Sequence, residues 1–301
     1  MCPDRRARVI PAALAVLLGC APMAGPAAAS MRLLPGASTE VGGIAYAHPS
    51  SIRFAETEGL FYVADTGNRR IVLLHANLEP LDAISLVPLG LRPFCALPAG
   101  DGSCWVSDLD RPDLYRVTGR GDCVDTLRLG PQATPGRMTW EAPGRLLVID
   151  RASRSILRFD LSLEGAAPEN LVVPGTGVIE DVAATANGEI DVVSATGSPI
   201  WSRDPRSGSW KPWGEHGVAA DQFSFPVAIC PDRSGGFWLV DAFRHEIRLL
   251  GGDREIQERV SPVPGQVSPL QFPVSAGQAA ADTITVLERG ACRVQRFARL
   301  P

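Results

Sequence analysis

The stretch "FYVADTGNRRIVLL", Phe61 to Leu74, alternates apolar residues as far as Asp65, turns through Thr-Gly-Asn and resumes as a second apolar run. Period-two alternation is typical of a β-strand, and two such runs joined by a short Gly-containing turn predict a hairpin. An apolar run that ends in an acidic or hydroxyl residue recurs about every 45 residues along the chain. The anchor residues that end these runs are Asp65, Asp108, Asp150, Ser194, Asp241 and Glu288.

Other positions, counted from the anchor residue of each copy, also carry the same residue types from copy to copy. Positions two and four before each anchor are apolar or Cys, a Gly stands six before the anchor in most copies, and a Pro precedes most copies by fifteen or sixteen residues. The Gly predicts a left-handed turn, and the anchor predicts an acceptor for backbone N–H groups of the turn that follows. A repeat of this length with four predicted strands is typical of a propeller blade. The sequence therefore predicts an all-β, six-bladed β-propeller with four-stranded blades.

Ring closure is predicted from the two ends of the repeat region. The last copy supplies three strands before the chain stops, whereas "MRLLPG", residues 31–36, has no blade of its own and resembles the fourth-strand segments of other copies. We expect this N-terminal strand to complete blade 6, since closure removes exposed sheet edges.

Two copies carry a family resemblance. "LFYVADTGNRRIVLL" (60–74) and "QFSFPVAICPDRSGGFWLVDAFRHEIRLL" (222–250) resemble the NHL repeat, and the resemblance extends over residues 38–301 with degenerate copies between. Copy 4 lacks both the Pro and the acidic anchor, and copy 6 lacks the Gly. By analogy with the family, residues around the first Pro of each blade lie near one mouth of the central channel. The candidate ligand-binding residues at that mouth are His48, Arg92, Arg137, Glu180, Asp181, Phe225 and Phe272.

Copy 4 is the exception among the blades. Where other copies have Pro it reads "VIED", which places Glu180 and Asp181 at the predicted mouth. These carboxylates could bind a ligand, remain solvated loop charges, or pair with Arg92 or Arg137. Asp191 occupies a mid-strand column that is mostly aromatic or aliphatic elsewhere, so it is expected to be partly buried and to need a partner, most simply from an adjacent blade.

The first thirty residues differ in composition from the rest. Three Arg residues precede an apolar stretch, Val9 to Leu18, that is too short to span a bilayer as a mature helix. "LLGC" then resembles a lipobox with Cys20 as the lipidated residue, which predicts a signal peptide (1–19), a tether (20–30) and the propeller (31–301). Ala21 favours the outer membrane by resemblance to sorted lipoproteins. The alternative is cleavage after Ala29, which gives a soluble periplasmic or secreted protein.

Charge and cysteine content limit the functional classes. The net charge of −4 comes from interspersed residues of both signs, without a long basic run, so a nucleic-acid footprint is not indicated. Five cysteines remain beyond Cys20, at spacings that match no zinc motif: Cys95, Cys104, Cys123, Cys230 and Cys292. Cys95 and Cys104 could form a disulfide across adjacent strands. Because five is an odd number of cysteines, at least one thiol stays free. The sequence leaves the pairing open.

Known propeller enzymes give two catalytic alternatives. The peptide-amidating lyase uses a zinc ion held by His residues from several blades, but the four His here share no blade register. Calcium-dependent lactonase-type propellers use carboxylates and Asn at the mouth, for which only Glu180 and Asp181 are suited. We therefore expect no catalytic residues and no cofactor, and a lipid-anchored, monomeric module that binds a protein, peptide or small ligand. A metal-dependent hydrolase or lyase, and a subunit of an envelope complex, remain alternatives.

Overall fold

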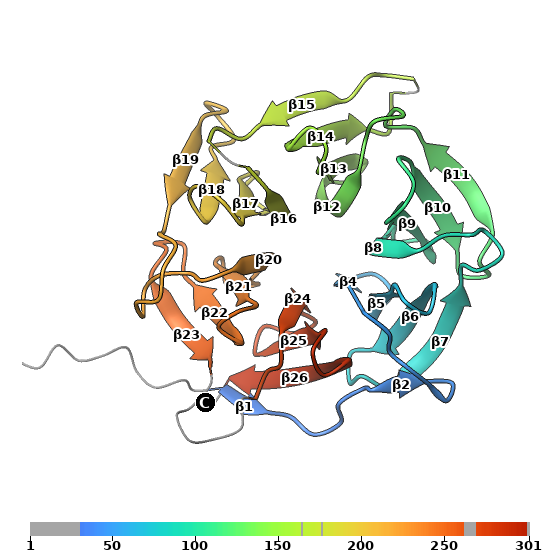
Figure 1. Ribbon diagram of the computed structural model, residues 1–301, viewed down its shortest axis with the longest axis horizontal. Helices are drawn as coiled ribbons and strands as arrows, with labels where there is room; N and C mark the ends of the chain where they lie inside the picture. Colours follow the sequence, from blue (N-terminus) through green and yellow to red (C-terminus); the bar gives the residue numbers. More distant parts are fainter. Residues whose placement is uncertain (1–30, 164, 176, 262–268, 300–301) are drawn as a thin grey trace, which may run out of the picture.

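The computed structural model describes residues 31–163, 165–175, 177–261 and 269–299. They form a ring of six four-stranded antiparallel sheets, and we call the region along the ring axis, lined by the innermost strands, the channel (Figure 1). Within these residues no helix is long and apolar enough to cross a membrane. The signal peptide, Cys20 and the tether expected from the sequence lie outside the described residues.

Each blade runs from an innermost strand at the channel to an outermost strand at the rim. Blade 1 contains β4 (Ser51–Ala55), β5 (Leu60–Asp65), β6 (Arg70–His75) and β7 (Pro80–Ser85). Blade 2 contains β8 (Pro93–Pro98), β9 (Ser103–Asp108), β10 (Leu114–Thr118) and β11 (Cys123–Leu127). Blade 3 contains β12 (Pro135–Ala142), β13 (Arg145–Asp150), β14 (Ser155–Asp160) and β15 (Glu169–Val172).

The second half of the ring follows the same order. Blade 4 contains β16 (Ile179–Ala184), β17 (Ile190–Ser194), β18 (Ile200–Arg203) and β19 (Trp210–Trp213). Blade 5 contains β20 (Pro226–Pro231), β21 (Phe237–Asp241), β22 (Glu246–Leu250) and β23 (Ile256–Val260). Blade 6 contains β24 (Pro273–Gly277), β25 (Thr283–Glu288), β26 (Arg293–Arg299) and β1 (Met31–Leu33), and a small hairpin of β2 (Glu40–Val41) and β3 (Ile44–Ala45) follows β1.

The two ends of the described chain meet in blade 6. β1 pairs antiparallel with β26, with Met31 opposite Arg299 and Leu33 opposite Phe297. The outermost strand of this blade thus comes from the N-terminal side of the chain and its other three strands from the C-terminal side. The innermost strands contact one another in a closed cycle from β4 through β8, β12, β16, β20 and β24 back to β4.

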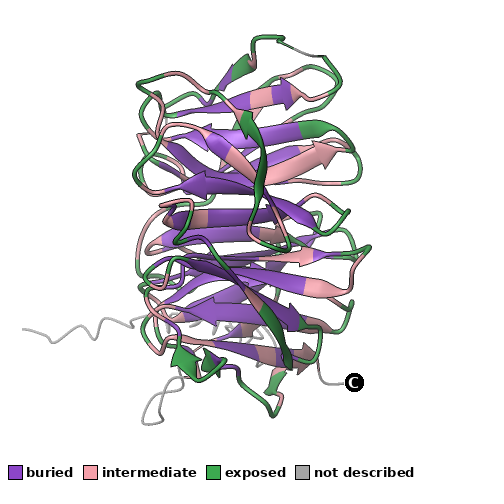
Figure 2. Cartoon of the chain, turned by 90° about the vertical axis from the view of Figure 1, so that its right-hand side faces the viewer, coloured by how far each residue is buried: buried purple, intermediate pink, exposed green. Residues whose placement is uncertain are grey.

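The hydrophobic core lies between blades. In the described chain six apolar clusters form, and each is shared by two neighbouring blades. The second strands are therefore covered on both faces, as their nearly continuous apolar sequences indicate: every residue of β9 is buried, whereas most of the outermost strand β11 is exposed (Figure 2). This packing fixes the six innermost strands rigidly around the channel.

Two repeat columns explain the turns. The column glycines adopt positive φ angles, 68° at Gly59 and 101° at Gly235, which confirms the left-handed turn expected six residues before the anchor. The anchors bind more than the turn that follows them. Asp150 accepts from the backbone N–H of Ala152 at 3.1 Å but also from Thr134 at 2.8 Å, just before its own blade's innermost strand. Each such anchor thus ties the start of the blade to the end of its second strand.

Bulges distinguish the starts of the innermost strands. In blades 2 to 6 the pairing of the innermost strand with its neighbour shifts register within the first few residues. In blade 4, Ile179 pairs with Ser194 and Asp181 with Val193, so Glu180 has no partner in the ladder. A bulge redirects the side chains beside it. The bulge therefore gives the consecutive carboxylates Glu180 and Asp181 different surroundings: Asp181 has a partner in the ladder and Glu180 has none.

The cysteines do not form the bridge that adjacent strands allowed. Cys95 and Cys104 are both free and buried, in β8 and β9, and the remaining three described cysteines are also free thiols. Cys95 lies opposite Ser107 and Cys104 opposite Pro98, so the two are not cross-strand partners. Burial raises the pKa of the Cys104 thiol, which therefore acts as a small apolar core residue.

Candidate functional site at the two ends of the channel

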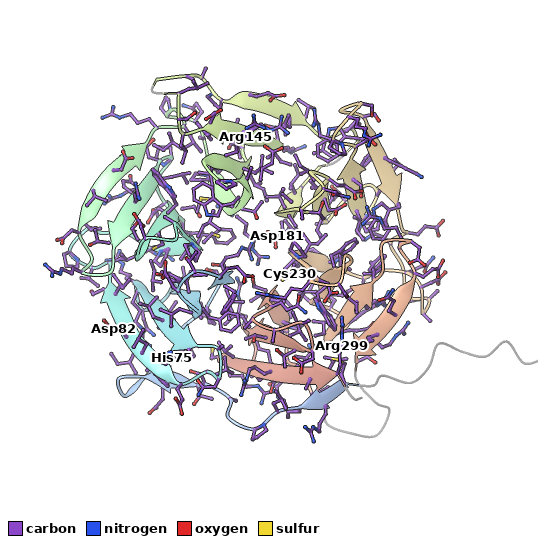
Figure 3. All side chains as sticks on the ribbon, turned by 180° about the vertical axis from the view of Figure 1, so that it is seen from behind. His75, Asp82, Arg145, Asp181, Cys230 and Arg299 are labelled. Carbon is purple, nitrogen blue, oxygen red and sulfur yellow. The ribbon has the colours of Figure 1, made fainter. Side chains whose placement is uncertain are left out.

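The channel has two chemically different ends. The first residues of the six innermost strands gather at one end, which we call the strand-start end, and their last residues and the following turns gather at the other, the strand-finish end. Between the two ends, Arg53 and Arg137 form ion pairs with Asp181. Asp181 lies close to the ring axis there (Figure 3).

Asp181 is the centre of a buried charge cluster. Its side chain is 0% exposed and pairs with two guanidinium groups, Arg53 at 2.8 Å through Oδ1 and Arg137 at 3.3 Å through Oδ2. Oδ2 also accepts from the backbone N–H of Ile229 at 3.1 Å. Both carboxylate oxygens are thus satisfied by groups from blades 1, 3 and 5. The pairing with Arg137 was one of the sequence-based alternatives, whereas Arg53 was not considered.

Arg137 extends this cluster across the axis. Its Nη1 donates to the carbonyl oxygen of Val227 at 2.7 Å, and its Nη2 donates to those of Ser50 at 3.1 Å and Val274 at 2.6 Å. These carbonyls belong to blades 5, 1 and 6. A guanidinium presents several donors in one plane, so one side chain can satisfy oxygens that converge from separate blades. Arg137 therefore links its own blade to blades 1, 5 and 6 through these carbonyls and to blade 4 through Asp181.

Sequence reasoning missed Arg53, although a signal was present. Arg53 lies in β4, and its Nη1 donates to Ser275 Oγ in blade 6 at 3.3 Å. In a closed ring the innermost strands line the channel, so a charged residue inside such a strand points to an axial role. The partner could not be read from the sequence because Arg53 and Asp181 are far apart in the chain and meet only when the ring closes.

Glu180 faces the strand-start end together with cationic groups. It is half-buried, and burial is the largest influence on its carboxyl group, raising the pKa despite the attraction of Arg137, Arg151 and Arg289. In the described chain Glu180 forms no ion pair with any of them. Arg151 follows β13 directly and Arg289 follows β25 directly, so the two come from opposite sides of the ring (Figure 1).

The residues at this end do not fit a divalent cation. Both oxygens of Asp181 are taken by Arg53, Arg137 and Ile229, which leaves Glu180 as the carboxylate nearby. A hard cation requires several oxygen ligands and is repelled by guanidinium groups. Across the described residues, no group of three or more His, Cys, Asp or Glu side chains is placed to hold a metal ion.

The other predicted mouth residues are not among the hydrogen-bond and ion-pair partners of Asp181 and Arg137 described above. His48 is exposed, and Arg92 pairs with Asp110 at 3.0 Å on the surface, with 40% and 56% of the two side chains exposed. Phe225 stacks on Phe243 at a centroid distance of 4.5 Å, and Phe272 lies 5.9 Å from Phe243. These aromatics form a small cluster between blades 5 and 6.

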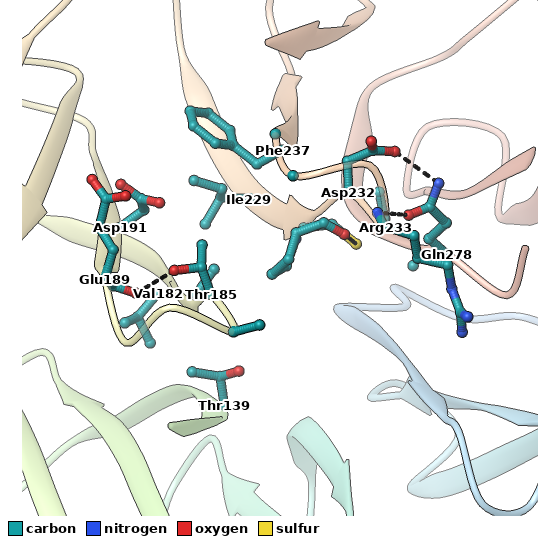
Figure 4. A pocket seen from close by; sticks show the side chains of 18 of the residues that line it. Thr139, Val182, Thr185, Glu189, Asp191, Ile229, Asp232, Arg233, Phe237 and Gln278 are labelled. Atoms are coloured by element: carbon teal, nitrogen blue, oxygen red, sulfur yellow. Dashed lines mark hydrogen bonds between the residues drawn. The ribbon is translucent and has the colours of Figure 1, made fainter. Parts of the chain in front are cut away.

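The strand-finish end contains a cavity of about 630 Å³ (Figure 4). All six innermost strands contribute to its wall. Its apolar surface comes mainly from Phe54, Leu97, Trp140, Val182, Ile229 and Phe237. Arg53 reaches the cavity from the axial cluster, so the same carboxylate, Asp181, supports a group at each end of the channel. This cavity could not be read from the sequence, because its wall combines the last residues of strands from all six blades with turns that vary between copies.

Asp191 is the unusual polar group of the cavity wall. It is 1% exposed, its Oδ1 accepts from the Ser202 hydroxyl and lies 3.3 Å from Arg254 Nη2, and its Oδ2 has no hydrogen-bond partner among the described residues. Burial raises its pKa to about 6, against the attraction of Arg254. Burial and a partner from the adjacent blade agree with the expectation from its column, and the bond to Ser202 within its own blade is additional.

Arg254 closes the seam between blades 4 and 5. Its guanidinium lies 5.0 Å from the ring centroids of both Trp213 and Phe237, and its Nη2 also donates to Glu189. Cation–π contacts on two rings hold the group in place. Nearby Cys230 lines the same cavity, and burial raises the pKa of its thiol to about 12, so this sulfur is protonated at neutral pH rather than nucleophilic.

Comparisons with known proteins support the fold. No family model and no curated protein matches the chain. Among solved structures, virginiamycin B lyase from Staphylococcus aureus is 16% identical with a TM-score of 0.61, covering 88% of this chain and 85% of that one. A catalytically inactive variant of that lyase with quinupristin is 13% identical, with a TM-score of 0.62 and coverage of 89% and 99%. A gluconolactonase from Xanthomonas campestris is 14% identical, with a TM-score of 0.64 and coverage of 84% and 86%.

These neighbours are propeller lyases and a lactonase, and at such identities the similarity extends to the six-bladed architecture alone. Their activities therefore do not transfer to this chain by fold. The chemistry has to be argued from its own residues.

Proposed function

We propose that this protein is a ligand-binding propeller whose site is the cavity at the strand-finish end. The observation that carries this proposal is the cavity of about 630 Å³ on the channel axis, bounded by all six innermost strands. Small-molecule sites are typically concave, mostly apolar and of roughly 300–1,000 Å³. The occupant is a small molecule or the terminal segment of a peptide or partner protein.

The lining fits such an occupant. Phe54, Trp140 and Phe237 provide flat apolar walls. Charged and polar side chains complete the lining, among them Asp191, Arg254, Asp232, Arg233 and Gln278. Because the interblade packing holds the innermost strands, the cavity is formed before the ligand arrives, which reduces the ordering cost of binding. A cavity with aromatic walls and charged and polar groups held by the ring can fix a ligand in one orientation, which favours binding at this site.

The test is a ligand screen by thermal shift on the purified protein, repeated on Thr139→Trp. Thr139 lies on β12 at the cavity wall (Figure 4), so an indole there occupies the space. The matched control is Thr126→Trp on the exposed strand β11. We expect compounds that stabilise the natural protein and Thr126→Trp but not Thr139→Trp. Compounds that stabilise all three proteins equally, or none that stabilise the natural protein, would contradict the site.

We also propose that the propeller is an NHL-type monomer tethered to the cell envelope, with the outer membrane as the favoured location. The support is the lipobox-like "LLGC", residues 17–20, which ends in Cys20. A Cys20→Ala variant should move from the membrane fraction to the soluble fraction of cells, while a Cys123→Ala variant should not. Equal partition of the Cys20→Ala variant and the natural protein would favour cleavage after Ala29.

A propeller lyase or lactonase is the second candidate, supported by the fold shared with the enzymes above. It requires a metal or a catalytic set at the channel mouth. Metal analysis of the natural protein and of Glu180→Ala separates the candidates: a stoichiometric ion lost in the variant would favour the enzyme. A metal-free natural protein would agree with the poor fit of the strand-start end to a divalent cation.

A further inference from the structure

Two guanidinium groups at the strand-start end lack a carboxylate partner. Arg151 and Arg289 occupy the same place in their blades, immediately after the second strand of blades 3 and 6. Both are half-buried, and neither forms an ion pair within the described residues. Partial desolvation of an unpaired cation is unfavourable, and an anionic partner would offset it. A partner from outside the chain is therefore suggested.

Arg151 is held in place rather than free. Its guanidinium carbon lies 4.8 Å from the ring centroid of Phe94, and its Nε is buried without an acceptor. Gly136 leaves room for its stem, because a Cβ at that position would stand 3.3 Å from Arg151 Cγ. Stacking fixes the plane of the group while leaving its donors unused.

Arg289 is held in a similar way from the other side. Its backbone N–H donates to the carbonyl oxygen of Phe272 at 3.0 Å, and its Nε reaches that of Pro49 at 3.5 Å. In the described structure its two terminal nitrogens have no protein acceptor. Arg151 and Arg289 thus keep spare donors at the same end of the channel.

Around Glu180 the arginines outnumber the carboxylates. Asp181 is shared by Arg53 and Arg137, so that cluster already carries one excess positive charge. Glu180 is the carboxylate next to Arg151 and Arg289, and burial weakens its ionised form. Burial also lowers the pKa of both arginines, and repulsion from Arg137 lowers that of Arg289 further. Bound negative charge would relieve this repulsion.

We infer that the strand-start end binds the oxyanion group of a small ligand, a carboxylate or a phosphate, through the donors that Arg151 and Arg289 leave unused. Guanidinium groups match both anions with paired N–H donors, and a site partly shielded from water strengthens such contacts. This site lies at the opposite end of the channel from the cavity and does not depend on it. Phe94, stacked beneath Arg151, supplies an apolar surface for the body of the ligand.

The experiment measures binding of two probes, inorganic phosphate and benzoate, by isothermal titration calorimetry, with sodium chloride at matched ionic strength as the blank. We expect saturable binding to the natural protein. The double variant Arg151→Met with Arg289→Met should weaken it at least tenfold. The control removes two exposed charges, Arg120→Met with Arg206→Met, and should change affinity less than threefold. Preference for benzoate identifies a carboxylate ligand, and preference for phosphate a phosphorylated one.

A second variant tests whether the site binds an anion or a cation. Glu180→Gln removes the negative charge beside the arginines with little change of shape, so anion affinity should rise severalfold. A cation site would show the opposite. Absence of saturable binding of both probes to the natural protein, equal affinity in the Arg151→Met/Arg289→Met variant, or weaker binding in Glu180→Gln would each overturn the proposal. Urea unfolding of every variant verifies that the fold persists.

Discussion

The same six strands line both ends of the channel, but the buried carboxylate near each end has different partners. In the central part, next to the strand-start end, Asp181 meets two arginines and uses both oxygens. At the strand-finish side, Asp191 is equally buried yet keeps one oxygen without a partner in the described structure. Both belong to blade 4, on neighbouring strands. The difference teaches that one buried carboxylate holds the ring together, whereas the other is positioned beside a cavity at a cost to stability.

The largest expected effect comes from removing the satisfied carboxylate. Asp181→Ala leaves Arg53 and Arg137 buried without their counter-charge, and we expect a loss of about 3–5 kcal/mol in the free energy of unfolding. Urea denaturation measures it. The control Asp110→Ala breaks the exposed pair with Arg92 and should cost less than about 1 kcal/mol. If both variants lose equally little, the axial cluster does not stabilise the ring.

For Asp191, whose Oδ2 has no partner in the described structure, removal of the charge should raise the free energy of unfolding rather than lower it. The pKa of Asp191 rises from 3.8 to about 6 on folding because the group is buried. The folded chain therefore holds the proton more tightly. This stabilising contribution is complete below pH 3.8 and is lost as the pH rises to 6. The shift of about two pH units corresponds to about 3 kcal/mol.

Asp191→Asn, which stays neutral, should therefore match the natural protein in stability near pH 4 and exceed it by up to about 3 kcal/mol at pH 7. The measurement is urea unfolding of both proteins across this range. Comparing them at each pH cancels the titration of other carboxyl groups. A difference that does not grow with pH would show that Arg254 and Ser202 already stabilise the ionised form.

These two aspartates also mark how far the sequence could predict the molecule. The blades were predictable because every blade packs the same apolar columns between neighbours, so local pattern and global fold agree. Asp181 and Asp191 were both identified as exceptions to their columns. Their partners were not all predictable, since Arg53 reaches Asp181 from blade 1 and Arg254 reaches Asp191 from a turn. Periodicity fixes which residues face the channel or a neighbouring blade, but not which charges meet there.

A smaller effect is expected at the cavity wall. Trp140 Nε1 donates to the carbonyl oxygen of Pro98 at 2.7 Å, which joins blades 3 and 2. Trp140→Phe keeps most of the apolar surface and removes this bond, so we expect a loss of about 1 kcal/mol in urea unfolding. A loss as large as that of Asp181→Ala would mean that the cavity wall, too, is part of the framework of the ring.

The smallest effect should come from Glu180, next to Asp181 in the chain but outside its ion pairs. Burial raises the pKa of Glu180 in the folded protein, so the stability linked to its protonated form is present at low pH and lost as the pH rises. Glu180→Gln should therefore raise the free energy of unfolding slightly at pH 7, by less than about 1 kcal/mol, and leave it unchanged well below the pKa of an unfolded Glu. A clear destabilisation at pH 7 would show that Arg151 and Arg289 depend on this carboxylate for their balance. The strand-start end would then be a closed ionic network, with no donors to spare for a ligand.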